Sequence, residues 1–192
     1  MLKKYIKISG KHALLCALIA VSTVIIDLVS KRIVMKNMYE GESVPLIRGI
    51  LNLTFITNDG AAFGSFSNHR WVFMLLSSVL LAVTVVLVLV WDQRSRLFYV
   101  GASLVFGGGI GNMIDRIAYG TVVDFIDFCA FPKLWKWIFN FADSFVCIGC
   151  GILILYYLIV ELGDAKRMKA VDCEKEKSPE DGEETAENDH NG

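Results

Sequence analysis

Apolar residues in this chain come in long uncharged blocks, without the alternation that marks amphipathic helices or half-buried strands. The blocks are His12 to Ile26, resuming after Asp27 as far as Val34, then Trp71 to Trp91, Leu97 to Ile114 and Ser144 to Val160. A helix rises about 1.5 Å per residue and the hydrocarbon layer is about 30 Å thick, so each block is near spanning length. The pattern predicts an all-α membrane protein with four transmembrane helices, at about residues 12–34, 71–91, 97–116 and 138–160.

The segment between the first two predicted helices, residues 37–70, differs from them in composition. Val44 to Phe55 mixes β-forming residues with Pro45 and Gly49, and Asn58-Asp59-Gly60 follows as a turn signal. We expect a small antiparallel β-sheet on the extracytoplasmic membrane surface.

Basic residues near the ends of the predicted helices suggest an orientation. One side of a four-span chain collects Lys3, Lys4, Lys7, Lys11, Arg94, Arg96, Lys166, Arg167 and Lys169. The opposite side also carries basic residues, in longer loops that hold the unusual polar residues. The positive-inside rule places both termini in the cytoplasm.

Charge is distributed unevenly along the 192 residues, which are 54% hydrophobic with a mean hydropathy of +0.50 and a net charge of −1. Residues 172–192 hold nine Asp and Glu against two Lys, a balance of −7, which leaves +6 for the rest. Such a segment buries too little apolar surface to fold. We expect a membrane domain over residues 1–171 and a disordered acidic cytosolic tail over residues 172–192.

The five cysteines do not form a disulfide framework. Cys147 and Cys150 make a CxxC, but in the middle of an apolar helix they are expected to be small packing residues. We expect no metal, no cofactor, no nucleic-acid partner and no obligatory protein partner.

Two carboxylates, Asp124 and Asp143, lie directly beside apolar blocks. An ionisable residue at membrane depth is costly and usually faces the protein interior to serve a function. Two neighbouring carboxylates cannot both ionise cheaply, so one keeps a proton while the other acts as a base. The histidines, at positions 12, 69 and 190, offer no constellation for a serine protease or a metalloprotease. The pair therefore suits acid–base chemistry.

Two further polar groups interrupt the apolar helices. Asp27 and Lys31 are four residues apart on one helical face. Asn112, Asp115 and Arg116 share another face after a glycine-rich run, where close packing or substrate approach is expected. For Asp115 and Arg116 the favoured interpretation is structural clamping of the loop, because an adjacent guanidinium keeps a carboxylate ionised.

Four motifs in order carry a family resemblance. They are Asn58 to Phe63, Gly107 to Arg116, Gly120 to Phe128 and Phe139 to Ser144. Together with the four-helix layout they resemble the lipoprotein signal peptidase (signal peptidase II) family of bacteria. The resemblance implies that Asp124 and Asp143 are catalytic. It also implies site-shaping or substrate-binding positions at Asp27, Lys31, Asn58, Gly60, Gly108, Asn112, Asp115, Arg116, Asn140 and Ala142. Leu28 stands where the family usually has Gln.

The resemblance further implies an intramembrane aspartic endopeptidase of the bacterial cytoplasmic membrane, with its active site near the outer face. Its substrates would be prolipoproteins carrying a diacylglyceryl cysteine, cut just before that residue, and membrane lipids would surround it. The alternative is a small transporter or proton relay through Asp27, Asp115, Asp124, Asp127 and Asp143. The second helix and the inner halves of the third and fourth are apolar, which leaves a relay no path across the membrane. A scaffold protein would not explain the polar residues gathered on one side.

Overall fold

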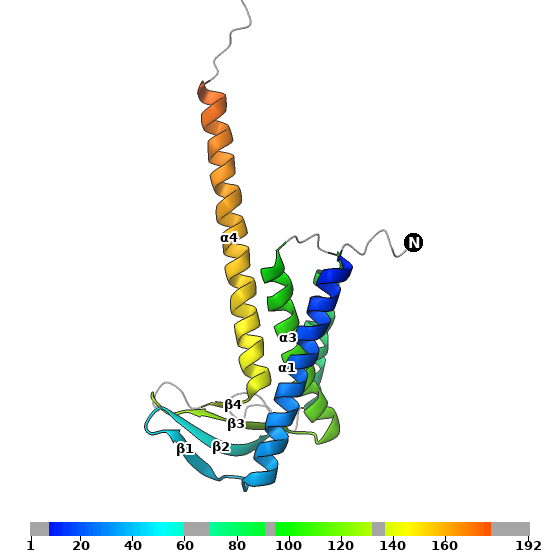
Figure 1. Cartoon of the computed structure of the whole chain (residues 1–192), viewed down its shortest axis with the longest axis vertical. Coiled ribbons are helices and arrows are strands. Elements are labelled where there is room, and N and C mark those ends of the chain that lie inside the picture. Colours follow the sequence, from blue (N-terminus) through cyan, green and yellow to red (C-terminus); the bar gives the residue numbers. More distant parts are fainter. Residues whose placement is uncertain (1–7, 60–69, 91–94, 132–136, 178–192) are drawn as a thin grey trace, which may run out of the picture. The chain divides into compact units, whose positions relative to one another are not determined.

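The computed structural model describes residues 8–59, 70–90, 95–131 and 137–177. Its elements, in chain order, are α1 (Gly10–Asn37), β1 (Ser43–Ile47), β2 (Leu51–Asn58), α2 (Arg70–Val90), α3 (Arg96–Ala118), β3 (Val122–Phe128), β4 (Ile138–Phe139) and α4 (Phe141–Lys177) (Figure 1). The chain divides into two compact units, Met1–Ile154 and Leu155–Gly192. The polar site lies in the first unit.

Three of the described helical segments are long and apolar enough to cross a membrane: Gly10–Asn37, Arg96–Ala118 and Phe141–Val160. A shorter apolar helix covers Met74–Val90. Many large apolar side chains on α1, α2 and α4 are exposed, Leu14, Trp71 and Ile148 among them. Contiguous apolar surface of this extent is typical of a lipid-facing protein. The predicted mostly helical membrane fold with a small antiparallel sheet is therefore confirmed.

The sheet has four antiparallel strands in the order β1-β2-β3-β4. Sequence patterning located β1 and β2, whereas β3 and β4 were not predicted as strands. Val122–Phe128 is rich in β-branched and aromatic residues, which favour strands, but its two aspartates are three residues apart and do not give the alternation of a half-buried strand. The register of β2 against β3 shifts between Leu53 and Ile56, just before Ile56 pairs with Asp124. Such an irregularity is common beside functional residues, because it re-aims side chains.

A hydrophobic cluster joins the end of α1 to the sheet. Its buried members are Val34, Phe55, Val123 and Phe125. In Figure 1 the sheet lies at the end of the helices where α1 and α3 finish and α4 begins. Burying these side chains is favourable by about 1.5–3 kcal/mol each. The cluster therefore fixes β3, and Asp124 with it, against α1.

Helix α3 packs against α1 and α2, and glycines bring it close to α4. A Cβ atom added at Gly149 would lie 2.7 Å from the Gly101 carbonyl oxygen. No side chain fits at that crossing, so small residues determine how closely the two backbones approach. Neither of these glycines was singled out from the sequence.

Helix α4 differs from the predicted fourth helix at both ends. Ile138 and Phe139 form β4 instead of the first helical turn, and Asn140 precedes the helix. At the other end α4 runs to Lys177, so residues 172–177 of the expected disordered tail are helical. Glu and Lys alternate there, and both favour helix. Residues 178–192 lie outside the described part of the chain.

Candidate active site

Asp124 is buried in the middle of β3, with a relative exposure of 2%. Its Oδ1 accepts a hydrogen bond of 2.6 Å from Asn140 Nδ2, and its Oδ2 accepts one of 2.9 Å from Asn58 Nδ2. Asn58 ends β2 and Asn140 lies between β4 and α4. Residues far apart in the sequence therefore hold both oxygens of the carboxylate.

Asp143 lies in the first turn of α4 and forms a reciprocal cap with Asn140. The backbone N–H of Asp143 donates to Asn140 Oδ1 at 2.9 Å, while Asp143 Oδ2 accepts from the Asn140 backbone N–H at 3.2 Å. This is the arrangement of a capping box, which satisfies N–H groups that the helix start leaves free. Because Asn140 also bonds to Asp124, one amide side chain links the two carboxylates.

Asn112 on α3 forms a second link. Its Nδ2 donates to Asp143 Oδ1 at 2.7 Å, and its Oδ1 accepts from Asn140 Nδ2 at 3.1 Å and from Lys31 Nζ at 3.0 Å. The amide is therefore oriented by α1, by α4 and by the residue that precedes α4.

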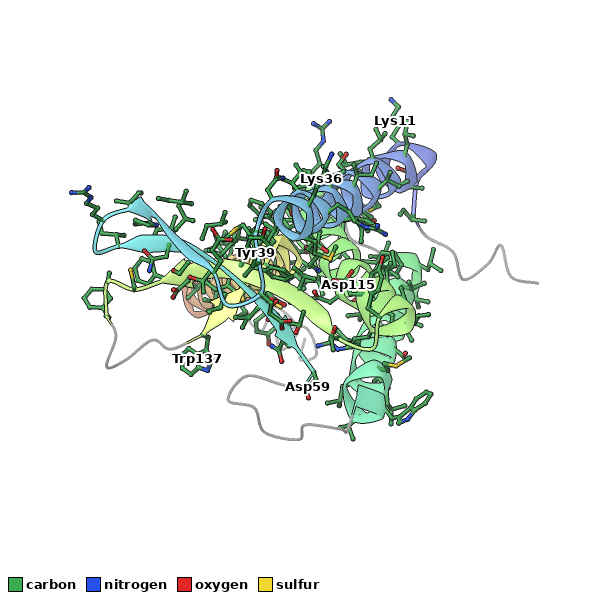
Figure 2. All side chains as sticks on the ribbon, turned by 90° about the horizontal axis from the view of Figure 1, so that it is seen from below. Lys11, Lys36, Tyr39, Asp59, Asp115 and Trp137 are labelled. Carbon is green, nitrogen blue, oxygen red and sulfur yellow. The ribbon has the colours of Figure 1, made fainter. Side chains whose placement is uncertain are left out.

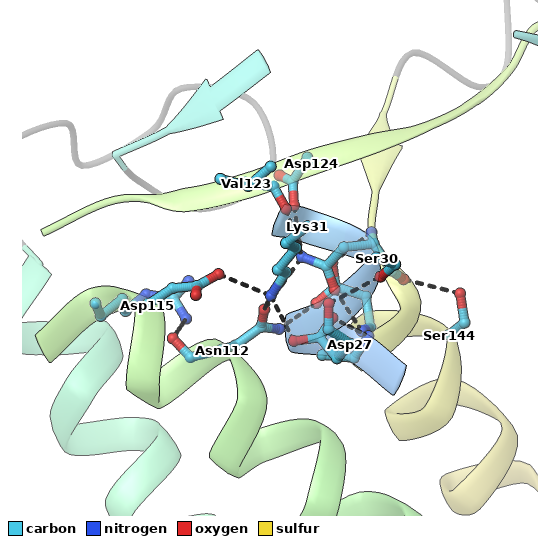
Figure 3. A network of polar contacts seen from close by, with 12 residues as sticks. Asp27, Ser30, Lys31, Asn112, Asp115, Val123, Asp124 and Ser144 are labelled. Carbon is cyan, nitrogen blue, oxygen red and sulfur yellow. Dashed lines mark hydrogen bonds and ion pairs between the residues drawn. The ribbon is translucent and has the colours of Figure 1, made fainter. Parts of the chain in front are cut away.

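Lys31 is the buried cation beside these amides. Its Nζ contacts Asp27 Oδ2 at 2.7 Å and Asp115 Oδ2 at 2.8 Å, in addition to Asn112 (Figure 3). The predicted pair of Asp27 and Lys31 is present, and three oxygens surround the ammonium group. Removing one partner of such a buried cluster leaves an uncompensated charge, which typically costs about 3–5 kcal/mol.

Asp27 also anchors the start of α4, since its Oδ1 accepts the Ala142 backbone N–H at 2.9 Å. The neighbouring glycines of α3 make room for this contact. A Cβ at Gly111 would lie 2.5 Å from Asp27 Oδ2, and one at Gly108 would lie 2.4 Å from the Ala142 carbonyl oxygen. The glycine-rich run therefore provides close helix packing, one of the two purposes expected for it.

Asp115 and Arg116, which were expected to clamp the loop, both contact residues of the network. The cation on Asp115 is Lys31, whereas Arg116 Nη1 donates to the Asn112 carbonyl oxygen at 3.4 Å. Adjacent residues on a helix point in directions about 100° apart, because 3.6 residues complete one turn. Asp115 is buried and Arg116 is partly exposed, with the charges of Asp143, Asp124 and Asp115 acting on it.

Burial and, to a smaller extent, the nearby charge of Asp143 raise the pKa of Asp124, which reaches about 7. Hydrogen bonds from Asn58 and Asn140 oppose the shift, as does the charge of Lys31, but the cost of burying a charge is larger. At neutral pH the Asp124 carboxyl therefore exchanges a proton readily. Such a pKa suits a general acid or base.

The structure brings most of the predicted site residues together. The hydrogen bonds and ion pairs of one network join Asp27, Lys31, Asn58, Asn112, Asp115, Asp124, Asn140, Ala142 and Asp143. Gly108 and Arg116 border it through the contacts given above. Gly60 lies outside the described residues. Within the described part of the chain, no group of three His, Cys, Asp or Glu side chains is arranged to hold a metal ion.

Asp127, the neighbouring carboxylate on β3, lies outside this network. Its Oδ2 accepts hydrogen bonds from Thr54 Oγ1 at 2.9 Å and from Asn52 Nδ2 at 3.5 Å. Those partners belong to β2. Asp127 therefore takes part in cross-strand contacts of the sheet.

Two contributions were not foreseen. Asn140 Nδ2 reaches the Val123 carbonyl oxygen at 3.3 Å, and Ser144 Oγ donates to the Asn140 carbonyl oxygen at 2.9 Å. The reciprocal cap of Asn140 and Asp143 could have been predicted from the sequence. An amide residue three positions before a carboxylate, at the start of an apolar run, is a signal for a capped helix start.

Comparison with known proteins gives consistent matches. Residues 19–159 match the family model described as signal peptidase (SPase) II. The lipoprotein signal peptidase of Halothermothrix orenii is 36% identical over 140 residues, 72% of this chain and 92% of the relative. That of Brevibacillus brevis is 40% identical over 140 residues, with 72% and 91% covered. A solved structure of a bacterial membrane enzyme has a TM-score of 0.71 at 36% identity, covering 80% of this chain and 92% of that one.

The family model covers well over half of the 192 residues, and the curated relatives are matched over nearly their full length. The motifs on which the resemblance rested fall inside the matched region, and most of their polar residues meet in one buried network. This chain belongs to the signal peptidase II family.

Proposed function

We propose that the protein is an aspartic endopeptidase of the bacterial membrane that removes signal peptides from prolipoproteins, with Asp124 and Asp143 as its catalytic pair. One observation carries the proposal: Asn140 bonds at once to the Asp124 carboxylate and to the N-terminus of α4 that bears Asp143. The family relationship supports the reaction class. A transporter or proton relay is not favoured, because the relatives are peptidases.

We assign the proton-carrying role to Asp124. Its pKa of about 7 keeps a large fraction protonated at neutral pH, because burial disfavours the charged form. Asp143 accepts N–H hydrogen bonds at both oxygens and takes the role of the ionised base. It removes a proton from the attacking water, while Asp124 donates its proton to the carbonyl oxygen. Asp143 then passes the proton taken from water to the leaving amine, and Asp124 recovers its own proton from the hydroxyl group as the carbonyl re-forms and the C–N bond breaks.

The other polar residues position this pair. Asn58, Asn112 and Asn140 fix the carboxylates by hydrogen bonds, and the Lys31 cluster holds α1, α3 and the start of α4 in register. Arg116 adds positive charge beside the carboxylates. We infer that Gly60, in the motif after Asn58, belongs to the loop that borders the substrate.

We also propose four membrane spans, in which α2 joins the three longer apolar helices α1, α3 and α4. Met74–Val90 is apolar, and the tryptophans at positions 71 and 91 suit the two interfaces. Both termini then lie in the cytoplasm, as the basic residues favour, and the sheet with Asp124 lies near the outer face. The cytosolic tail follows residue 171 as an acidic extension of the peptidase domain.

A signal peptide spans the membrane as a helix whose amides are hidden, so cleavage requires an unwound stretch held in a protein cavity. We propose that the substrate's cysteine carries a diacylglyceryl group that lies against the apolar flanks of the helices. The scissile bond, just before this cysteine, is thereby brought to the boundary where Asp124 and Asp143 lie.

Purified full-length protein should be incubated in lipid nanodiscs with one prolipoprotein in two forms, with and without the diacylglyceryl group. We expect cleavage of the modified form directly before the cysteine, identified by mass spectrometry of the mature N-terminus, and at least tenfold slower cleavage of the other. Equal rates on both forms would refute the lipid requirement.

Asp124→Asn and Asp143→Asn serve as the mechanistic arm of this assay. Asn keeps the shape of each side chain but supplies neither a base nor an acid, so each variant should lose activity by several orders of magnitude while retaining wild-type thermal stability within a few degrees. Near-normal turnover by either folded variant would remove the aspartic mechanism.

A further inference from the structure

The end of α1 bears a shallow groove that is separate from the catalytic network. Its volume is about 430 Å³, and it is lined by Leu28, Val29, Arg32, Ile33, Lys36 and Asn37. Two lining residues are cationic and none is acidic. Within the described part of the chain, Lys31 forms ion pairs, whereas Arg32 and Lys36 form none.

The acidic residues that follow α1 in the sequence are occupied elsewhere. Glu42 Oε2 accepts the Tyr39 backbone N–H at 2.9 Å, and Glu40 Oε1 accepts the N–H and the hydroxyl of Thr57. The two cations of the groove therefore form a local excess of positive charge.

Arg32 is held in place by an aromatic residue of the turn that follows α3. Its Nη2 donates to the Tyr119 hydroxyl at 2.6 Å, and its guanidinium lies 5.7 Å from the centre of the Tyr119 ring. A planar guanidinium can bind an aromatic face and still offer N–H groups to an anion. Lys36 is one helical turn further on and is exposed. In Figure 2 it lies on the outer side of α1, away from Asp115.

A stripe of apolar side chains on α1 runs up to this groove. Its members are Leu14, Leu18, Val21, Ile25, Val29 and Ile33, spaced three or four residues apart and each between 51% and 62% exposed. Side chains at that spacing share one helical face. Lys11 and Arg32 are 21 residues apart, about 31 Å along the helix, which is about the thickness of the hydrocarbon layer. With α1 across the membrane, Arg32 and Lys36 of the groove are expected at the level of the lipid headgroups and the apolar stripe at the level of the acyl chains.

We propose that this groove binds an anionic phospholipid, whose phosphate contacts Arg32 and Lys36 and whose acyl chain lies along the α1 stripe. Charge complementarity favours an anionic headgroup, because a choline ammonium would find no carboxylate in the lining. A soluble phosphate would use the cations but not the stripe. The proposal does not depend on the peptidase assignment.

The test uses delipidated full-length protein in detergent, titrated with dioleoyl phosphatidylglycerol or with dioleoyl phosphatidylcholine. Native mass spectrometry counts bound lipids, and thermal unfolding gives Tm. We expect one phosphatidylglycerol to bind at least tenfold more tightly than phosphatidylcholine and to raise Tm. Inorganic phosphate at the same concentrations should leave Tm unchanged. Equal binding of the two lipids, or a shift with phosphate alone, would overturn the proposal.

The double variant Arg32→Gln with Lys36→Gln should lose this preference. Its matched control, Lys11→Gln with Arg48→Gln, removes the same charge from exposed positions outside the groove and should keep it. Because Arg32→Gln also removes the Tyr119 contact, Lys36→Gln alone provides a variant that should fold normally and bind phosphatidylglycerol at least threefold more weakly. Unchanged binding by Lys36→Gln, or equal loss in the control, would refute the site.

Discussion

Asn140 Nδ2 lies 2.6 Å from Asp124 Oδ1 while Asn140 Oδ1 accepts the backbone N–H of Asp143. One side chain thus connects a strand with the first turn of a helix. Its relative exposure is 0%, so water does not compete for these bonds. The relative position of the two carboxylates therefore depends on the amide group of Asn140.

Replacing Asn140 should separate its two roles. Asn140→Ala removes the helix cap, which typically costs about 1 kcal/mol, together with the bond to Asp124. Asn140→Ser keeps a capping oxygen but cannot donate to Asp124 as Asn140 does. We expect both variants to lose at least about tenfold in kcat/KM, but only the Ala variant to show a clearly lower Tm. Normal activity in the Ser variant would contradict the bridging role.

The rate should fall as pH rises through about 7. Burial raises the pKa of Asp124 to about 7 from an ordinary value of 3.8, and in our assignment its protonated form is the active one. Above that pKa, kcat/KM should decrease about tenfold per pH unit. A profile from pH 5 to 9 on the lipidated substrate provides the measurement. A rate that increases through pH 7 would assign the base role to Asp124 instead.

The same ionisation should lower stability. A carboxyl group with a raised pKa in the folded state contributes stability that is fully present below its unfolded pKa and lost as pH rises through the folded pKa. For Asp124 this window runs from about 4 to about 7. We expect the Tm of Asp124→Asn to decrease less across this window than the Tm of the wild type. Parallel Tm profiles would argue against a raised pKa.

Asp127→Asn should reduce activity only partially. Asp127 contacts Thr54 and Asn52 on β2, and no hydrogen bond described here links it to Asp143. Asn retains an acceptor oxygen, so β3 keeps its cross-strand contact and kcat/KM should fall less than about tenfold. Asp124→Asn, three residues away, is the matched comparison. Complete loss in Asp127→Asn with an active Asp124→Asn would reverse the assignment.

Gly108→Ala should destabilise the protein and impair catalysis together. The added Cβ would lie 2.4 Å from the Ala142 carbonyl oxygen, a backbone atom that cannot move without displacing the start of α4. Overpacking of this kind costs about 1–3 kcal/mol. Gly151→Ala, whose Cβ would have no neighbour within 4 Å, is the control and should be neutral or slightly stabilising. A wild-type Tm for Gly108→Ala would show that the two helices can separate freely.

Deleting residues 172–192 should leave specific activity within about twofold. In the proposed topology this acidic segment is cytosolic and the catalytic pair lies near the outer face, with a layer about 30 Å thick between them. Charges exposed to solvent are screened over about 10 Å at ordinary salt, so the tail cannot change the pKa of Asp124. Initial rates of truncated and full-length protein in the same nanodiscs test this. A severalfold decrease in rate with intact folding would mean that the tail regulates the enzyme or that the proposed topology is the wrong way round.

The sequence by itself determined the helical membrane class, because backbone groups in lipid must be satisfied within each segment and long apolar runs can do so only as helices. It also determined the contact of Asp27 with Lys31, since residues four apart on a helix meet wherever that helix packs. The candidate carboxylates could also be identified from the sequence, because the family motifs depend only on the order of residue types along the chain.

The tertiary structure decided which of these groups meet. In addition to Asp27, Lys31 binds Asp115 and Asn112, which are more than eighty residues away in the sequence. The pairing of β3 with β2 and the link from Asn140 to Asp124 likewise join separate segments. Such contacts depend on how α1, α3, α4 and the sheet pack, and local patterns carry no information on that. Burial then set the protonation of Asp124, because the pKa of a carboxyl group follows its surroundings.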